Sequence, residues 1–419
     1  MGHSPHPESF DARTNRDRSS GKTPAPCPST PRILLVSRNF PPLLGGMERL
    51  NQHLLQELER TYEVHLVGPA GAKDYVLHPE RARTCPPRPV SAFLACAAVQ
   101  GMRLGRQERP GLVIAGSGVN APPAWLAAKA SGARWMVYLH GLDLVASHLA
   151  YQRVFLPVIR RADAWLVNSH ATARLADAAG LDGARVHLLH PGVEIPGTPA
   201  CADQIRAWRD SRGFGERPLL LSVGRLTKRK GLREFVIHAL PAILAAHPDT
   251  VLGVVGEEPH AALSAATVGV EMLREAARAN GTDPSLRILG RLSDTQLGLA
   301  YRAATALVFP VLDTPDDIEG FGMVAIEAAA HGLPTVAFAV GGVPDAIAEG
   351  VSGYLIGPGD YASMASRLIA LVSHGPGAGD RGHCMAFASR FAWPQFGTRL
   401  RGICQSVMAS PKMLGRTAP

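Results

Sequence analysis

Short runs of consecutive apolar residues recur along most of the chain, separated by longer stretches in which apolar residues return every three or four positions. The short runs are typical of strands buried on both faces of a parallel sheet, and the longer period is typical of covering helices. The predicted strands are 32–37, 64–67, 112–115, 135–139, 164–167, 186–189, 219–223, 251–256, 286–290, 306–309 and 335–339. This alternation predicts an α/β fold of doubly wound, Rossmann-like domains.

Breaks in this pattern indicate the domain boundaries. Residues 1–31 are rich in Ser, Pro, Thr and Arg with almost no aliphatic residues, so we predict a disordered N-terminal segment. The first domain is expected over 32–195, and the second over 218–390. Between them, residues 196–217 carry Pro, Gly and polar residues around one short helical patch, which is typical of an interdomain linker.

Composition excludes several classes of protein. With 419 residues, 46% of them hydrophobic and 19% charged, the chain resembles an ordinary protein of two or three domains. No apolar run approaches the ~18 residues needed to span a bilayer, and no secretory signal is recognisable, so we expect a cytoplasmic protein. The six cysteines show neither a C-x-x-C pair nor zinc-ligand spacing. We therefore expect them to be reduced, with no metal site.

The formal charge of +8 is concentrated in the first half of the chain. Residues 1–194 hold 22 of the 43 Lys and Arg residues but only 15 of the 35 Asp and Glu residues. Six arginines lie within or around the helix-like stretch 92–104, namely Arg81, Arg83, Arg88, Arg103, Arg106 and Arg109. This basic region is expected either to rest on an anionic membrane surface or to be the solvated face of a core helix.

The stretch 308–360 carries the clearest candidate chemistry. Glu319 precedes a helix that is predicted to open at about Gly322, and Glu327 lies roughly a turn and a half inside it. The glycines beside Phe321 permit close backbone approach, and the free N–H groups of a first helical turn bind phosphate. The expected donor-binding residues here are Gly320, Phe321, Gly322, Met323, Val324 and Glu327. The alternative is that both acids are ordinary helix and surface charges.

A second candidate site follows strand 219–223. Arg225 lies at the strand end and Lys230 at the start of the next predicted helix, 232–244, so both cations can converge on one polyanion. Phosphate is the natural partner for such a pair. A basic surface turn is the alternative interpretation.

Three loops of the first half also follow predicted strands. Gly45 and Gly46 lie between the first strand and the first helix, and His140 comes directly after strand 135–139, where doubly wound sheets collect ligands. A tight turn and a structural histidine are the alternatives. The sequence Gly116-Ser117-Gly118 imitates a dinucleotide-binding fingerprint, but two prolines follow it and no acid ends the next strand. An NAD-dependent oxidoreductase is therefore disfavoured.

These motifs resemble those of the retaining glycosyltransferases of family 4. Glu319 and Glu327 fit the family pattern E-G-F-G-x-x-x-x-E, and Arg225 and Lys230 fit G-R-x-x-x-x-K-G. The similarity continues in F-P-P-x-x-G-G at 40–46 and in H-G-x-D at 140–143. The resemblance implies a GT-B fold, in which two Rossmann-like domains face a central cleft. It also implies that 391–419 form a helix returning to the first domain, followed by a tail.

The resemblance further implies the roles of individual residues. The catalytic candidates are His140, Arg225, Lys230 and Glu319. Arg225 and Lys230 would bind the diphosphate of a nucleoside diphosphate sugar and Glu319 its sugar hydroxyls, with His140 beside the transferred sugar. Glu327 would bind the ribose, and Gly45 and Gly46 would let the diphosphate or sugar of the donor approach the backbone closely. No D-x-D motif is present, so no metal or other cofactor is expected. The expected partners are a nucleotide-sugar donor and a glycan or glycolipid acceptor, without nucleic acid. An anionic membrane surface is a further candidate partner, on the evidence of the basic region alone. A non-catalytic nucleotide-sugar-binding protein is the alternative.

Overall fold

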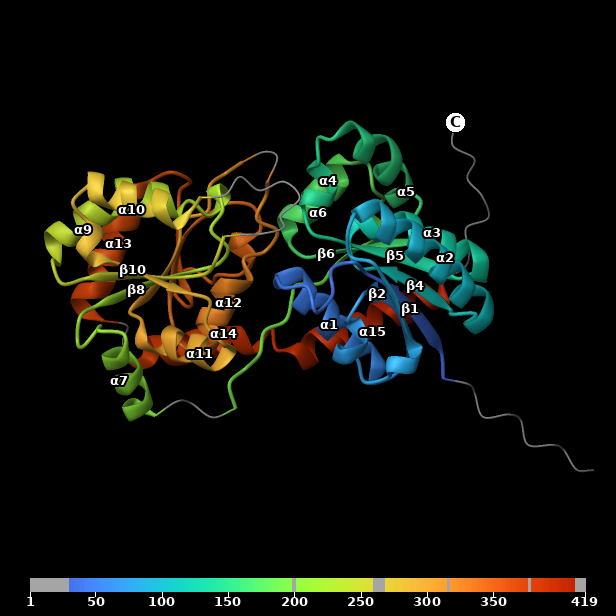
Figure 1. Ribbon diagram of the computed structural model, residues 1–419, viewed down its shortest axis with the longest axis horizontal. Coiled ribbons are helices and arrows are strands. Elements are labelled where there is room, and N and C mark those ends of the chain that lie inside the picture. Colours follow the sequence, from blue (N-terminus) through green and yellow to red (C-terminus); the bar gives the residue numbers. More distant parts are fainter. Residues whose placement is uncertain (1–29, 198–200, 259–267, 315–316, 376–377, 411–419) are drawn as a thin grey trace, which may run out of the picture. The chain divides into compact units, whose positions relative to one another are not determined.

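The structure is a computed structural model that describes residues 30–197, 201–258, 268–314, 317–375 and 378–410. Most of the N-terminal segment predicted to be disordered, and the tail beyond 410, lie outside the described residues. Within them the chain forms a seven-stranded and a six-stranded sheet, and every strand pair is parallel. Helices cover both faces of each sheet (Figure 1), which confirms the predicted α/β class.

The first sheet has the strand order β3-β2-β1-β4-β5-β6-β7. Its strands are β1 (Arg32–Val36), β2 (Glu63–Pro69), β3 (Ala82–Cys85), β4 (Leu112–Ala115), β5 (Arg134–Leu139), β6 (Ala164–Val167) and β7 (Val186–Leu188). Its helices are α1 (Gly46–Glu59), α2 (Val90–Glu108), α3 (Ala121–Ser131), α4 (Leu142–Val145), α5 (Leu156–Ile159), α6 (His170–Ala178) and α15 (Trp393–Ala409). One apolar core joins the sheet to α1 and α15, and another joins it to α2, α3, α5 and α6.

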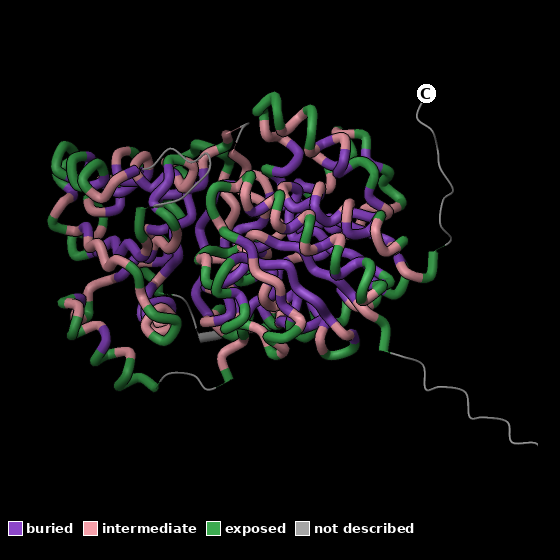
Figure 2. The backbone as a smooth tube through the Cα atoms, turned by 45° about the vertical axis from the view of Figure 1, so that its right-hand side comes forward, coloured by how far each residue is buried: buried purple, intermediate pink, exposed green. Residues whose placement is uncertain are grey.

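The second sheet has the order β10-β9-β8-β11-β12-β13. Its strands are β8 (Leu219–Val223), β9 (Val251–Val255), β10 (Leu286–Gly290), β11 (Ala306–Phe309), β12 (Thr335–Phe338) and β13 (Gly353–Ile356). Its helices are α7 (Ala202–Ser211), α8 (Leu232–His238), α9 (Leu240–Ala246), α10 (Val270–Ala279), α11 (Asp294–Ala303), α12 (Met323–Ala330), α13 (Tyr361–His374) and α14 (Ala378–Ser389). Figure 2 shows how the buried residues follow the strands of both sheets, while the outer helix faces are exposed.

Some elements differ from the sequence-based expectation. Strands β3 and β13 were not predicted, and the single helix expected over 232–244 is divided into α8 and α9 at Ala239. Pro241 explains the division, since a proline has no backbone N–H to continue a helix and fits only a first turn. Within the span expected to be a linker, α7 packs against α11, and Trp208 is buried in the core of the second domain.

The cysteine prediction is wrong for one pair. Cys85, at the end of β3, forms a disulfide with Cys96 in α2, and their Cα atoms are 5.7 Å apart. The reason is topological, because the chain turns from the end of the edge strand β3 directly into the helix that packs beside it. In the described part of the chain, Cys201, Cys384 and Cys404 are free thiols.

Helix α2 lies at the centre of the basic region. Phe93, Ala97 and Leu104 are buried in the core, and α2 packs along α3. Arg103 and Arg106 remain exposed on the outer side. This arrangement makes α2 a core helix with a solvated basic face, and contact with a membrane stays a prediction. Among the described helices, none combines the length and hydropathy that crossing a bilayer would require.

Each sheet reverses its strand order at one point, between β1 and β4 in the first sheet and between β8 and β11 in the second. The loops after these strands leave the sheet in opposite directions and open a crevice in which doubly wound proteins bind ligands. In the second sheet these two loops carry Arg225 and Lys230 on one side and Glu319 on the other. The fold therefore brings together Lys230 and Glu319, which are 89 positions apart in the sequence.

Candidate active site

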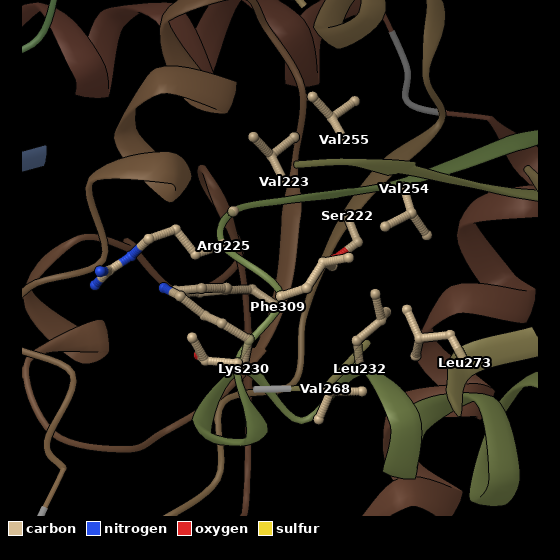
Figure 3. A pocket seen from close by; sticks show the side chains of 13 residues that line it. Ser222, Val223, Arg225, Lys230, Leu232, Val254, Val255, Val268, Leu273 and Phe309 are labelled. Atoms are coloured by element: carbon tan, nitrogen blue, oxygen red, sulfur yellow. The ribbon is translucent and has the colours of Figure 1, made fainter. Parts of the chain in front are cut away.

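A pocket lies at the carboxyl ends of β8, β9 and β11. Its lining is apolar at the base, with Leu232, Val254 and Phe309 among the residues, and cationic at the mouth, where Arg225 and Lys230 lie. Figure 3 shows both cationic side chains extending to the same side of the pocket. The Lys230 ammonium also lies 4.8 Å from the centre of the Phe309 ring. The two cations therefore converge as the sequence predicted.

Glu319 is the acid that Lys230 and the neighbouring Arg229 contact. Its carboxylate accepts a hydrogen bond from Lys230 Nζ at 2.7 Å and another from Arg229. Arg229 is in turn paired with Asp317, at 3.1 Å from Nε to Oδ1. Arg225 is exposed, and its side chain has no ion pair or hydrogen bond within the described residues. One cation is thus free for an anionic ligand while the others are held by carboxylates.

The charges of this cluster are strongly coupled. Burial alone would raise the pKa of Glu319, but the positive charges of Lys230 and Arg229 outweigh it and lower that pKa to about 2. Burial lowers the pKa of Lys230, and Arg229 and Arg225 lower it further, whereas Glu319 opposes the shift. Glu319 is therefore an ionised hydrogen-bond acceptor at neutral pH, as recognition of sugar hydroxyls requires.

Helix α12 begins at the edge of the same cluster. Gly322 is its N-cap, with φ of 90°, and a Cβ there would come 3.0 Å from the Phe309 ring. The backbone N–H groups of Met323 and Val324 have no acceptor among the described residues. These groups and the helix dipole suit a phosphate, as predicted. Phe321 differs, because its side chain is buried against other aromatic rings, so only its backbone faces a ligand.

Glu327 lies farther along α12 and is held at both of its oxygens. Oε2 accepts a hydrogen bond from the Tyr301 hydroxyl at 3.1 Å, and Oε1 lies 3.3 Å from Arg49 Nη1. Burial raises the pKa of Glu327, and the charge of Arg49 opposes that rise. The interpretation of Glu327 as an ordinary surface charge is therefore wrong, because only 18% of its side chain is exposed.

His140 stands at the carboxyl end of β5, in the first domain. Its Nε2 lies 3.1 Å from the carbonyl oxygen of Gly116, and its backbone N–H donates to Asp143 at 3.0 Å. A carbonyl only accepts, so Nε2 carries the ring hydrogen and Nδ1 is left as an acceptor. Burial lowers the pKa of His140, against the charge of Asp143. The ring is thus a neutral acceptor, suited to a hydroxyl.

The side chain of Glu48 occupies the Gly45–Gly46 loop, where close approach of a donor diphosphate or sugar was expected. The Glu48 carboxylate lies directly over Gly45, where a side chain on the glycine would collide with it. The start of α1 therefore already has an anion of its own, which argues against a diphosphate there. Gly46 remains near the donor-binding candidates, since a Cβ at this position would lie 3.4 Å from the sulfur of Met323.

The first and second domains meet directly at the candidate site. A Cβ on Gly320 would lie 2.6 Å from the His140 carbonyl oxygen and 2.6 Å from Asn168 Nδ2. Nearby, Asp345 Oδ2 accepts from the backbone N–H of His170 at 2.6 Å and lies 3.0 Å from its Nδ1. The Glu319-Gly320 loop is thus adjacent to the backbone of His140, and Gly320 is needed because no side chain fits between them.

Two clusters of described side chains have the composition of a metal site. In the first, ligand atoms of His170, His190 and Asp345 lie within 4.8 Å of one another. His190 Nδ1, however, lies 3.0 Å from the Asn168 carbonyl, so that nitrogen carries a hydrogen and is not a ligand. The second cluster consists of Glu63, His65 and Glu108, and both of its carboxylates pair with Arg32. This cluster lies at the amino ends of β1 and β2, opposite to the strand ends that carry the candidate site.

The dinucleotide-like loop after β4 is filled by the protein itself. A side chain at Gly116 would collide with Asn51 and Ser37, and one at Gly118 would collide with Asp143 and Tyr151. The Gly118 N–H donates to Asp143 at 3.0 Å. These glycines therefore admit neighbouring side chains rather than a pyrophosphate.

Three residues of the site were not identified from the sequence: Arg49, Arg229 and Tyr301. Arg229 stands between Lys228 and Lys230, so its position in a basic run was the available signal. Arg49 and Tyr301 lie on helices whose local pattern gives no sign of a distant carboxylate.

Comparisons with known proteins agree with this geometry. Residues 204–382 match the family described as Glycosyl transferases group 1, and residues 44–195 match Glycosyltransferase Family 4. The chain is 28% identical over 346 residues to the GDP-mannose-dependent alpha-(1-6)-phosphatidylinositol monomannoside mannosyltransferase of Mycolicibacterium smegmatis, covering 80% of this chain and 88% of that enzyme. It is 32% identical to D-inositol 3-phosphate glycosyltransferase 2 of Catenulispora acidiphila, covering 56% of this chain and 54% of that protein.

Solved structures share the fold. Anabaena Alr3699/HepE in complex with UDP superposes with a TM-score of 0.73 at 19% identity, covering 90% of this chain and 100% of that one. Sucrose-phosphate synthase from Thermosynechococcus elongatus gives 0.72 at 20% identity, covering 90% of this chain and 99% of that one. At such identities the likeness extends to the fold alone.

Proposed function

This chain belongs to glycosyltransferase family 4, and from that premise we propose that it transfers a hexosyl-type sugar from a nucleoside diphosphate sugar, with retention at the anomeric carbon. The proposed acceptor is a hydroxyl of a glycolipid or a growing polysaccharide. The observation that carries the proposal is the convergence of Arg225 and Lys230 on one pocket mouth beside Glu319 and the start of α12.

The proposed mechanism follows from where negative charge develops. Breaking the bond between the sugar and the donor releases a diphosphate, and preorganised positive groups stabilise the growing charge. Arg225, Lys230 and the free N–H groups of α12 provide such groups without a metal ion. In this scheme the leaving phosphate takes the acceptor's proton as the acceptor attacks from the same face, so no side-chain nucleophile is required.

The two acids and His140 would orient the substrates. Glu319, kept ionised by Lys230 and Arg229, would accept hydrogen bonds from sugar hydroxyls. Glu327 would accept them from the ribose. His140 would face the sugar with Nδ1 as an acceptor, at the contact between the first domain and the Glu319-Gly320 loop.

The names of the similar proteins indicate which donors to test first. The mycobacterial relative is named for GDP-mannose and for a phosphatidylinositol mannoside, which supports a GDP-sugar donor and a glycolipid acceptor. HepE was solved with UDP-glucose, so UDP-sugars belong in the same panel. A thermal-shift screen with UDP-, GDP- and ADP-sugars identifies the donor, because a ligand that binds the folded state raises its apparent stability.

Transfer or hydrolysis of the identified donor then tests the enzyme. We expect Lys230→Ala and Glu327→Ala to lose most of the activity while keeping the far-UV circular dichroism spectrum of the folded wild type. Near wild-type rates in both variants would refute the assignment. The rival, a non-catalytic nucleotide-sugar-binding protein, predicts a thermal shift with the donor but no release of nucleotide with any acceptor.

A peripheral contact with the membrane is proposed separately. The exposed arginines of α2 and the positive charge of the first half support attraction to anionic lipids. Sedimentation with phosphatidylglycerol-containing liposomes at low salt tests it, and we expect Arg103→Glu with Arg106→Glu to reduce co-sedimentation. A wild-type protein that stays in the supernatant would contradict this contact.

A further inference from the structure

Arg49 is a residue of the first domain that reaches into the donor half of the site. It lies on α1, three positions after Gly46, and its two terminal nitrogens reach two acids of the second domain. Nη1 is 3.3 Å from Glu327 Oε1, and Nη2 is 3.3 Å from Asp294 Oδ1. In the part of the chain that the structure describes, Arg49 is the only cation paired with Glu327.

The two acids differ in how much they depend on this contact. Asp294 is 89% exposed, so water already solvates its charge and an ion pair adds little. Glu327 is 18% exposed, and its remaining partner is the neutral Tyr301 hydroxyl. A largely buried carboxylate that loses its cation becomes protonated more readily, because burial disfavours the charged form. Arg49 therefore matters chiefly to Glu327.

The proposed role of Glu327 makes that dependence functional. A carboxylate accepts hydrogen bonds at both oxygens, whereas a protonated carboxyl loses part of this capacity and donates instead. Two ribose hydroxyls are donors that an ionised Glu327 suits. Arg49 approaches one oxygen through a single N–H of its five, so the pair leaves acceptor capacity on that carboxylate for a ligand.

We propose that Arg49 is a positioning residue of the donor site, which keeps the Glu327 carboxylate ionised and aimed at the donor ribose. The inference rests on the proposed function of Glu327. It makes the first domain part of donor recognition, because the residue that prepares the ribose contact comes from α1. A donor would then bind well only when the two domains are in contact at this point.

Binding of UDP, GDP and ADP, measured by isothermal titration calorimetry, tests the inference. With whichever nucleotide wild-type protein binds, we expect Arg49→Ala to weaken binding by about tenfold or more, as for loss of a charged hydrogen-bond partner. Arg49→Lys should restore part of the loss, since it retains the charge without the planar fork. Arg60→Ala is the matched control, because Arg60 follows the other end of α1 and, among the residues that the structure describes, its side chain pairs with Glu57 alone. It should bind as wild type does.

The 2′-deoxy form of the same nucleotide distinguishes an effect of Arg49 on the ribose contact from an effect on the contact between the domains. Wild type should lose affinity for the 2′-deoxy form, and Arg49→Ala should lose much less, because the contact is already impaired. The pH dependence should agree, with binding by Arg49→Ala failing at a higher pH on acidification than binding by wild type.

The possible outcomes distinguish failure of the proposed function from failure of the Arg49 inference alone. Wild-type protein that binds none of UDP, GDP and ADP would overturn the proposed function and this inference with it. Wild-type binding together with undiminished binding by Arg49→Ala would overturn the inference alone. An equal loss for the 2′-deoxy form in wild type and variant would also overturn it, since Arg49 would then act away from the ribose.

Discussion

The ammonium of Lys230 donates to the carboxylate of Glu319 at 2.7 Å, across the point where the second sheet reverses its strand order. One residue follows β8 and the other follows β11, so the contact exists only when these two strands are neighbours. The ion pair at the candidate site therefore depends on the pairing of β8 with β11 at the centre of the second sheet.

Replacement of Lys230 tests the stabilisation of the leaving group. We expect Lys230→Ala to lower kcat for donor turnover by on the order of a hundredfold or more, as for loss of one preorganised donor to a developing anion. Lys228→Ala is the matched control, because Lys228 is an exposed lysine of the same turn without an ion pair among the described residues. Equal rates in both variants would contradict the role of Lys230.

The pKa of Glu319 predicts a stability effect at acid pH. The folded state lowers this pKa from 4.5 to about 2, so the ionised carboxylate stabilises the fold fully above about pH 4.5. That contribution is lost as pH falls from about 4.5 towards 2. Urea unfolding of wild type and Glu319→Gln should show a constant difference in free energy above this window and a shrinking one within it. A difference that grows on acidification would show that the pair does not hold Glu319 ionised.

Gly320 is expected to tolerate no side chain. A methyl group there would lie 2.6 Å from the His140 carbonyl oxygen, and such overpacking costs about 1–3 kcal/mol. Since the collision is between domains, we expect Gly320→Ala to lower kcat/KM by about tenfold or more while leaving the melting temperature nearly unchanged. Gly357→Ala, which meets nothing within 4 Å, should behave as wild type in both assays.

Chelation tests the proposal that no metal ion takes part. If Arg225, Lys230 and α12 carry the diphosphate charge, addition of EDTA to the purified enzyme should leave the transfer rate unchanged. Added Mg²⁺ or Mn²⁺ should likewise have little effect. A rate that collapses with EDTA and recovers with either ion would refute the metal-free mechanism.

Central strands could be predicted closely because they are buried on both faces. Strands β4, β8 and β11 have the same bounds as the apolar runs that predicted them. Strand β3 lies at a sheet edge and reads ARTC, with no apolar run to identify it. The Cys85–Cys96 disulfide escaped prediction for the same reason, since it depends on where that edge strand ends.

The residues of the candidate site also fall into two groups, those that the sequence pattern could place and those that it could not. Arg225, Lys230 and Glu319 follow predicted strands, so the reversal of strand order brings them together without knowledge of any contact. Arg49 could not be assigned, because its partner Glu327 is 278 positions away and belongs to the other domain. Glu48 was missed as the occupant of the Gly45 loop, because side-chain direction within a first helical turn is not visible in the pattern.

Helix α15 gives the chain an unusual order of assembly during synthesis. Trp393, Phe396 and Leu400 complete the core on one face of the first sheet, so that core draws on residues from both halves of the sequence. Domains commonly fold in the order in which they leave the ribosome. Here the second domain is fully synthesised before the first receives its final helix. Until then Leu54 and Leu58 of α1 lack part of their cover, and a nascent chain stalled before residue 393 is the state in which a chaperone would be needed most.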